Sequence, residues 1–273
     1  MALANTALLA IIKLGGDVLA PPALNVAAAE IARACASGRR LIVVHGGGPQ
    51  TTELSRRLGI EPKLVGGRRI TDAASLDVVK MVVAGRLNVD LVAALRAAGV
   101  PAVGLAGSSG VVRAHRRPPR VVSGSDGAAV DFGLVGDVEG IDRALLDALD
   151  AGGYLPVVAC LGADAAGTTL NINADVVASQ LAAAVGAAAL VACTAVGGVR
   201  RDKDDPATRI PRLTVAEARA AIADGVVQGG MIPKLEEAFA PLAAGVGAVH
   251  IVAPGEIAAS LATPGSVGTL LVA

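Results

Sequence analysis

Two stretches of the chain decide the fold: LLAIIKLGG at residues 8–16 and RLIVVHGGGP at residues 40–49. Each is a short run of aliphatic, largely β-branched residues that ends in glycines, a pattern typical of a buried strand. The residues between them, 23–37, are rich in alanine and favour a helix. Strand, helix and strand together predict a βαβ unit with two parallel strands.

The same alternation continues along the chain. Leucines and valines recur at intervals of three and four over residues 76–95, which predicts a long amphipathic helix that stops at Gly99. Residues 111–138 are richer in Arg, Pro, Gly and Ser, and we expect them to form hairpins laid on the main sheet. Further strands are expected at residues 100–105, 155–161, 188–196 and 248–252, and further helices at 142–151, 174–185, 215–224 and 231–244.

This order of elements predicts an α/β protein, a three-layer αβα sandwich around a mostly parallel open sheet. The chain has 273 residues, more than the usual domain length of about 100–200, so we expect two lobes. We place the boundary in the small-residue segment GADAAGTT, residues 162–169, which divides the chain into lobes at 1–166 and 167–273. Ligands of such folds bind at the carboxyl ends of the strands.

Composition narrows the class of partner. The 24 basic residues balance the 24 acidic ones, which leaves no global field for nucleic acid or an anionic membrane. We therefore expect small-molecule partners, with no nucleic acid and no membrane. The three cysteines lie far apart without a CxxC pair, which indicates reduced thiols, no zinc site and a cytoplasmic protein. The uncharged residues 176–199 are interrupted by Gly186, so they predict a helix and a strand rather than a membrane span.

Glycine-rich strand ends are the candidate phosphate sites. Gly46, Gly47 and Gly48 follow the second strand and precede Pro49, which suits the first turn of a helix. Such a turn directs backbone N–H groups and the positive helix end at an anion, although it also occurs as a purely structural turn. Lys13 and the two glycines after Leu14 repeat the pattern with a cation added. Neither GxxxxGK[ST] nor a GxGxxG after the first strand is present, so another phosphate chemistry is needed.

Six motifs in order carry a resemblance to the amino acid kinase family. They are KLGG at 13–16, HGGG at 45–48, GRRITD at 67–72, VDFGLVGD at 130–137, NINAD at 171–175 and GMIPK at 230–234. The resemblance runs from about residue 8 to the C-terminal end. It implies the amino acid kinase fold, with an N-terminal lobe for an acyl-amino acid and dimerisation and a C-terminal lobe for the nucleotide.

The family's functional residues carry over onto matching positions. By resemblance, Lys13 and Lys234 contact the ATP phosphates, and Asp175 orients both lysines. The acyl-amino acid is implied to bind Gly47, Gly48, Arg69 and Asn171, with Arg69 on its α-carboxylate. Mg²⁺ is implied to be held mainly by the nucleotide, with no metal site on the protein. The implied nucleotide contacts are Gly15, Gly16, Gly46, Thr194, Ala195, Val196, Gly197, Gly198, Val199, Arg200, Val226, Val227 and Gln228.

Two positions depart from the family pattern. Arg68 stands at a position that is hydrophobic in the family, where it adds a cation beside Arg69. Ala195 stands where the family usually has an aspartate, in the loop on the nucleotide side. The resemblance gives Arg68 no role, and the change at Ala195 bears on the nucleotide contacts.

The reaction implied is the ATP-dependent phosphorylation of the γ-carboxylate of N-acetyl-L-glutamate to N-acetyl-L-glutamyl 5-phosphate, in arginine biosynthesis. A carboxyl group with a pKa of about 4.3 is ionised at neutral pH, so this nucleophile needs no general base. The obstacle is repulsion, since two anions about 4 Å apart repel by about 4 kcal/mol at an effective dielectric constant of about 20. Lysines, magnesium and backbone N–H groups offset this repulsion by stabilising the negative charge electrostatically.

Three alternative functions stay open. A related kinase of lysine biosynthesis acts on aminoadipate or glutamate linked to an acidic carrier protein, and the basic residues 113–120 would suit such a partner. The HGGG motif also resembles an esterase oxyanion loop, and GSSG at 107–110 is close to a nucleophile elbow, which would make the chain a hydrolase. A non-catalytic amino-acid sensor is the third. Independently of these functions, Asp175 and Asn173 stand where a helix begins and are open to an alternative role as helix caps alone.

The resemblance also bears on assembly and regulation. Arginine-inhibited members of the family carry an extra N-terminal helix that joins dimers into hexamers, and few residues precede the first predicted strand here. We therefore expect a homodimer that is insensitive to arginine.

Overall fold

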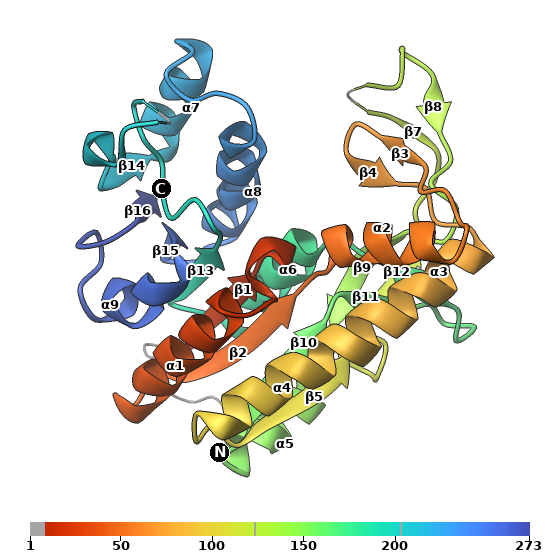
Figure 1. Cartoon of the computed structure of the whole chain (residues 1–273), viewed down its shortest axis with the longest axis horizontal. Coiled ribbons are helices and arrows are strands. Elements are labelled where there is room, and N and C mark those ends of the chain that lie inside the picture. Colours follow the sequence, from red (N-terminus) through yellow and green to blue (C-terminus); the bar gives the residue numbers. More distant parts are fainter. Residues whose placement is uncertain (1–8, 123, 203) are drawn as a thin grey trace.

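The computed structural model describes residues 9–122, 124–202 and 204–273, and its centre is an eight-stranded sheet in the order β14-β16-β15-β13-β1-β2-β10-β5 (Figure 1). The strand β1 (Leu9–Leu14) lies parallel between β2 (Arg40–His45) and β13 (Ala189–Cys193). Within this sheet, as described, only β15 and β16 pair antiparallel. The other strands are β5 (Ala102–Ala106), β10 (Leu155–Ala159), β14 (Arg212–Thr214), β15 (Ala248–Val252) and β16 (Thr269–Val272).

Helices cover the sheet on both faces, as the α/β pattern predicts. On one face, α1 (Ala23–Ala36) connects β1 to β2 and contacts α4 (Asn88–Ala97) and α9 (Ile257–Ala262). On the other, α6 (Ala174–Val185) crosses β1, β2 and β13 and contacts α8 (Met231–Ala243). The predicted βαβ unit and three-layer class are thereby confirmed. The remaining helices of this sheet are α5 (Ala144–Ala151), against β10, and α7 (Val215–Ala223), against β14.

The predicted long helix is continuous but not uniform. It begins as α3 (Ala73–Val79), where the Asp72 carboxylate accepts a hydrogen bond from Ser75 N at 2.8 Å, and it continues into α4. Between them, residues Lys80–Leu87 wind as a π-helix, which periodicity does not predict. This wider segment directs Val83 and Leu87 at Gly47, in the glycine turn after β2. A π-helical stretch inside an α-helix is frequent at functional sites.

The predicted hairpins do not lie on the main sheet. The predicted region contains β6, β7, β8 and the start of β9; β6 and β9 join a second sheet in the order β12-β11-β6-β9, and β7 and β8 form a small ribbon. A second small ribbon, β3-β4, lies outside the predicted region, and the two ribbons stand side by side at the upper right of Figure 1. The reason is that these short strands are polar and have one solvent-exposed face. Such strands pair with each other more readily than with a sheet whose two faces are both buried. Their bounds are β3 (Leu64–Val65), β4 (Arg68–Arg69), β6 (Val112–Arg116), β7 (Arg120–Val121), β8 (Ala129–Val130), β9 (Gly136–Ile141), β11 (Leu161–Ala163) and β12 (Thr169–Asn171).

The segment at residues 162–169 is a hairpin and not a free linker. Leu161 pairs with Asn171 across β11 and β12, and the Asp164 carboxylate accepts hydrogen bonds from Ala166 N and Thr168 N in the turn. The predicted strand at 155–161 is therefore two strands, β10 and β11, which separate at Cys160 and belong to different sheets.

The uncharged stretch at residues 176–199 divides as predicted. The helix α6 ends at Gly186, which has a positive φ of 64°, and β13 follows. Among the described residues, the structure contains no helix with the length and apolarity needed to span a membrane. Residue 8, the expected start of the first strand, lies outside the described residues.

Candidate active site

An ion pair connects the first strand to the start of α6. The Lys13 Nζ lies 2.8 Å from Asp175 Oδ1, and the two side chains are 13% and 24% exposed. Burial alone would lower the pKa of Lys13, but the charge of Asp175 and the hydrogen bond to it outweigh burial, and the pKa is raised. Asn173 supplies the helix cap, because its side chain accepts a hydrogen bond from Asp175 N at 2.7 Å. Asp175 is therefore not the cap, and its carboxylate is committed to the lysine.

Two glycine turns meet beside this ion pair. A Cβ on Gly16 would lie 2.8 Å from Pro49 Cδ, and a Cβ on Gly46 would lie 3.2 Å from Ala174 Cβ at the start of α6. The Gln50 side chain also donates to Gly16 O at 2.6 Å. The helix α2 (Gly48–Arg57) begins in the second turn, so its first N–H groups have no partner within the helix. This arrangement suits an anion that enters at the carboxyl ends of β1 and β2.

His45 at the end of β2 is fully buried and hydrogen-bonded. Its Nδ1 lies 3.0 Å from Gly46 O, and its Nε2 lies 3.0 Å from the Asn88 side-chain nitrogen, which also donates to Val157 O. Burial lowers the pKa of His45 to about 4, so the ring is neutral at neutral pH. These contacts agree with a structural role in holding the glycine turn.

A second cluster of polar residues lies where the β3-β4 ribbon and the second sheet meet the helix α2. The Arg69 guanidinium donates to Thr52 Oγ1 at 2.6 Å and to Gly48 O at 3.3 Å. The Asn171 side chain donates to Thr71 Oγ1 at 3.1 Å. Arg69 Nη1 is buried without a hydrogen-bond partner in the structure as described, and burial lowers the pKa of Arg69. A buried cationic donor without a partner fits an anionic ligand.

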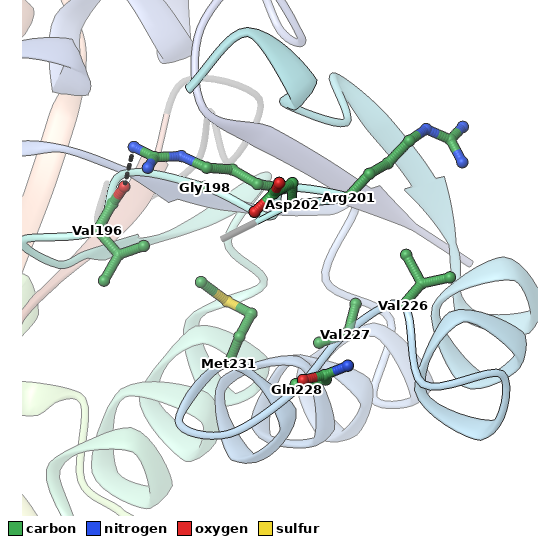
Figure 2. Close-up of a pocket in the computed structure, with 9 residues that line it drawn as sticks. Val196, Gly198, Arg201, Asp202, Val226, Val227, Gln228 and Met231 are labelled. Carbon is green, nitrogen blue, oxygen red and sulfur yellow. Dashed lines mark hydrogen bonds between the residues drawn. The ribbon is translucent and has the colours of Figure 1, made fainter. Parts of the chain in front are cut away.

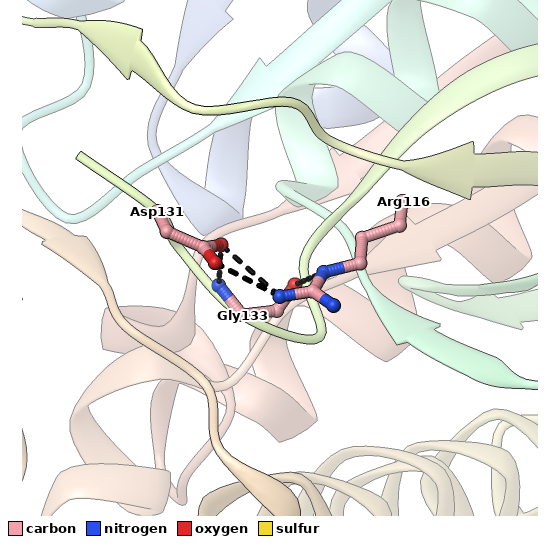
Figure 3. A network of polar contacts seen from close by, with 3 residues as sticks. All are labelled: Arg116, Asp131 and Gly133. Carbon is pink, nitrogen blue, oxygen red and sulfur yellow. Dashed lines mark hydrogen bonds and ion pairs between the residues drawn. The ribbon is translucent and has the colours of Figure 1, made fainter. Parts of the chain in front are cut away.

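The motif at residues 130–137 supports this cluster (Figure 3). Arg116 donates to Gly133 O and to the Asp131 carboxylate, both at 2.9 Å, and Gly133 N donates to Asp131 Oδ1 at 2.8 Å. Gly133 has a φ of 71°, and a Cβ there would lie 2.5 Å from Thr71 O. The neighbouring Leu134 N donates to Thr71 O at 2.7 Å. The motif therefore fixes the strand segment that carries Arg69 and Thr71.

The basic run at residues 113–120 is partly paired within the protein. Arg116 pairs with Asp131, Arg117 pairs with Asp137 at 2.7 Å, and His115 lies 3.2 Å from Glu139. These ion pairs take up two of the four arginines of the run, Arg116 and Arg117.

The nucleotide-side segments line a cavity of about 340 Å³ between the loop after β13 and the start of α8 (Figure 2). Met231 and three valines form apolar walls, and the Arg200 side chain donates a hydrogen bond to Val196 O at 3.4 Å. Of the predicted nucleotide residues, Val196, Gly198, Arg200, Val226, Val227 and Gln228 line this cavity; Arg201, Asp202 and Met231 also line it and were not predicted.

The other predicted loop residues lie outside this cavity. Thr194 N donates to Val252 O, and Val199 N donates to Thr269 Oγ1 at 2.8 Å, so both hold the loop to the sheet. Gly197 has a φ of 70°, and a Cβ there would lie 2.8 Å from Ala253 Cβ. Ala195 N donates to the Asp17 carboxylate at 2.9 Å. Asp17 thus joins the first glycine turn to the nucleotide-side loop, which sequence analysis missed.

Lys234 lies half-buried on the first turns of α8. Within the described ranges, Asp175 forms an ion pair with Lys13 and not with Lys234. One turn further along α8, the Glu237 side chain lies near Asp175 and Asn173. Part of Glu237 is exposed, yet protein atoms around its carboxyl group and the nearby Asp175 raise its pKa to about 7. The only sequence signal that pointed to Glu237 was its spacing of three residues from Lys234.

A parallel sheet with glycine turns and a paired lysine at its carboxyl edge defines a phosphoryl-transfer class of protein, and the comparisons agree. Residues 9–253 match the model described as the Amino acid kinase family, and the chain belongs to this family. It is 56% identical over 266 residues to the acetylglutamate kinase of Sorangium cellulosum, with 96% of this chain and 94% of the relative covered. The acetylglutamate kinase of Anaeromyxobacter dehalogenans is 53% identical, with 96% and 98% covered.

Solved structures show the same fold. The N-acetylglutamate synthase of Neisseria gonorrhoeae, complexed with coenzyme A and N-acetyl-glutamate, superposes with a TM-score of 0.82 at 25% identity, covering 98% of this chain and 60% of that one. The carbamate kinase of Giardia lamblia bound to AMP-PNP superposes with a TM-score of 0.70 at 16% identity, covering 97% and 98%. The second likeness concerns the fold alone.

Proposed function

We propose that this chain transfers the γ-phosphoryl group of ATP to the γ-carboxylate of N-acetyl-L-glutamate, giving N-acetyl-L-glutamyl 5-phosphate in arginine biosynthesis. It is an acetylglutamate kinase activity, and the near full-length identity to kinases of that name supports it. The observation that carries the proposal is the Lys13–Asp175 ion pair between two glycine turns. A charged lysine held among backbone N–H groups stabilises a transferring phosphoryl group.

The acyl-amino acid binds in the cluster around Arg69. The unpartnered Arg69 Nη1 donates a hydrogen bond to one oxygen of the substrate's α-carboxylate. Asn171 and the N–H groups of Gly47 and Gly48 hold the rest of the molecule. The γ-carboxylate then points toward Lys13. No side chain has to remove a proton from it, and the neutral, buried His45 is not required as a base.

The nucleotide extends from the cavity of Figure 2 to the glycine turns. Its base lies against Val196, Val226 and Met231, and its phosphates reach Lys13 and Lys234. Magnesium enters with the nucleotide and neutralises phosphate charge when bound. Among the described residues, no group of three or more His, Cys, Asp or Glu is placed to hold a metal. The proposal has magnesium held mainly by phosphate oxygens, the hard ligands that it prefers.

Lobes, assembly and location complete the proposal. We assign the acyl-amino acid to residues 1–166 and the nucleotide to residues 167–273. The assembly is a homodimer, with the exposed Met81 and Val89 on the long helix as candidate contacts. Light scattering should give the dimer mass, and millimolar arginine should leave activity unchanged; hexamers or inhibition would contradict this.

We place the enzyme in the cytoplasm, where ATP is available and where the free thiols of Cys35, Cys160 and Cys193 remain reduced.

A hydroxamate assay tests the activity. An acyl phosphate reacts with hydroxylamine to give a hydroxamate and inorganic phosphate, so ATP and free N-acetyl-L-glutamate should together yield hydroxamate. No product from the free substrate but product from a carrier-linked one would favour the lysine-biosynthetic kinase. Ester cleavage without ATP would indicate a hydrolase, and ligand binding with no turnover would indicate a sensor.

A further inference from the structure

A buried chain of hydrogen bonds connects the long helix to the glycine turn after β2. Asn88, the first residue of α4, and His45, the last residue of β2, are both buried. The Asn88 side-chain nitrogen lies 3.0 Å from His45 Nε2 and 3.1 Å from Val157 O. On the other side of the ring, His45 Nδ1 lies 3.0 Å from Gly46 O. The chain of contacts therefore ends on the backbone of the turn that leads into α2.

The two contacts of Asn88 fix the tautomer of the histidine. Val157 O is a backbone acceptor, so the part of the Asn88 amide that faces it is the NH2 group and not the oxygen. The same NH2 group donates to His45 Nε2, which therefore carries no proton. Burial lowers the pKa of His45 to about 4, so the ring is neutral and its one N–H is at Nδ1. His45 Nδ1–H is thus the donor to Gly46 O.

This donor sets the direction of the next backbone N–H. The peptide bond between Gly46 and Gly47 is trans, so its C=O and its N–H point in opposite directions. Because the His45 ring holds Gly46 O, the N–H of Gly47 points away from that ring. Gly47 is the N-cap of α2, where the N–H groups have no partner within the helix. The contact therefore leaves Gly47 N–H directed outward as a donor for a ligand.

Two adjacent residues of the long helix hold this arrangement. Leu87 ends the π-helical segment and lies against Gly47, where a Cβ would overlap its side chain. The next residue, Asn88, reaches His45. A Cβ on Gly104 in β5 would overlap the Asn88 side-chain oxygen, so this glycine leaves the room that the amide needs. The helix thus fixes the turn by packing and by hydrogen bonding at once.

We propose that His45 and Asn88 are positioning residues for phosphoryl transfer, which hold the peptide between Gly46 and Gly47 with its N–H directed at the transferring group. The proposal rests on the proposed function, which places the acyl-amino acid at Gly47 and brings the nucleotide phosphates to the glycine turns. A donor that is oriented before the reaction stabilises charge in the transition state without having to reorganise. Between two glycines, a peptide that nothing holds is free to turn over and present its carbonyl oxygen to the anion. The His45 ring prevents that orientation.

Two substitutions of His45 separate positioning from packing. His45→Asn places a side-chain NH2 group near the position of Nδ1, so it keeps a donor for Gly46 O. His45→Gln reaches further, to the position of Nε2, and loses that donor. His250→Gln is the matched control, because His250 is also a buried strand histidine. It lies on β15, which β13 and β1 separate from β2.

For each protein, kcat is measured in the hydroxamate assay and the Kd for AMP-PNP with magnesium is measured by calorimetry. His45→Gln should lower kcat at least tenfold, because loss of one oriented donor costs a factor of about 100 to 1,000. It should also raise the Kd about threefold or more, since a donor to the phosphates is lost. His45→Asn should keep both values close to those of the unmodified protein, and His250→Gln should change neither.

Gly104→Ala is a second test variant that leaves both positioning residues in place. Its added methyl group displaces the Asn88 amide from the His45 ring, so kcat should fall about threefold or more. Circular dichroism checks that each variant is folded. An unchanged kcat in Gly104→Ala and His45→Gln, or equal losses in His45→Gln and His45→Asn, would overturn the inference.

Nuclear magnetic resonance reads the tautomer independently of turnover. Long-range ¹H–¹⁵N correlation spectra of the histidine-labelled protein should show His45 protonated at Nδ1 and bare at Nε2, with the signals assigned from the His45→Asn and His250→Gln proteins. A proton at Nε2 would overturn the inference. A failed hydroxamate assay, with this tautomer and the expected order of Kd values intact, would overturn the proposed function alone.

Discussion

Asp17 accepts a hydrogen bond at 2.9 Å from the backbone N–H of Ala195, which connects the turn after β1 to the loop after β13. These strands are neighbours in the sheet, so their carboxyl ends meet. Ala195 stands where the family usually has an aspartate. In this chain a carboxylate still meets the loop at this position, because Asp17 directly follows the first glycine turn and accepts from Ala195 N.

Replacing Asp17 should weaken nucleotide binding selectively. Without the carboxylate, the loop that carries Val196 and Gly198 loses a hydrogen bond to a charged group, worth about 1.5–3 kcal/mol. Asp17→Ala should raise the KM for ATP at least fivefold and leave the KM for N-acetyl-L-glutamate within a factor of two. Asp17→Asn keeps an acceptor and should show a smaller change, as initial-rate kinetics would establish. Equal changes in both KM values would contradict a role confined to the nucleotide side.

Removing either lysine should lower turnover without unfolding the protein. Lys13→Ala and Lys234→Ala each delete a cation that stabilises the transferring phosphoryl group, and we expect kcat to fall at least tenfold. Lys80→Ala is the control, since Lys80 is exposed and pairs only with Asp77 among the described residues. Circular dichroism checks the fold. Near-normal kcat in both variants would refute the assignment.

Arg69 and Arg68 make a matched pair for substrate binding. Arg69 is partly buried with one nitrogen unpartnered, whereas its neighbour Arg68 is exposed. Arg69→Ala should raise the KM for N-acetyl-L-glutamate more than tenfold, because a charge-assisted hydrogen bond is worth about 1.5–3 kcal/mol. Arg68→Ala should change it less than threefold. The reverse order would place the α-carboxylate on Arg68.

Two buried histidines should make the fold sensitive to mild acid. The pKa values of His45 and His250 fall from 6.5 to about 4, chiefly through burial. The unfolded chain therefore binds more protons between those values, so stability is complete above pH 6.5 and is lost as the pH falls toward 4. The difference corresponds to roughly 3 kcal/mol for each histidine.

Urea unfolding at pH 7 and pH 5 measures this loss. His45→Gln should reduce the decrease in the free energy of unfolding between the two pH values. His115→Gln is the control, because His115 is half-exposed at the surface and should leave the decrease unchanged. A decrease that is the same in all three proteins would show that His45 does not cause it.

Much of the central architecture was predictable from local pattern. Strands such as β1 and β2 are buried on both faces, so they appear in the sequence as unbroken aliphatic runs, and the glycines at their ends mark the turns. The expected helix bounds hold to within one or two residues for α1, α6, α7 and α8. These strands, turns and helix bounds were predictable because each is determined by local interactions or by burial alone.

Other elements depend on partners distant in the chain. The strand β14, at one edge of the sheet, and β16 beside it are three and four residues long and were not predicted, because so short a run carries no periodicity. The separate second sheet forms because β6 pairs with β9 and also with β11, which lies about 50 residues further along the chain. The π-helical turn likewise reflects the packing of Leu87 on Gly47.

For the site, sequence alone determined the lysines, the glycine turns and Asp175, since these stand in recognisable motifs at strand ends. It did not separate the roles of Asn173 and Asp175, and it gave no reason to single out Asp17 or Glu237. Those two are ordinary acidic residues in a turn and on a helix. Only the contact of α6 with α8, and of the loop after β13 with the turn after β1, brings their charges to the lysine. Electrostatic interaction depends on distance in space, and the tertiary structure alone decides that distance.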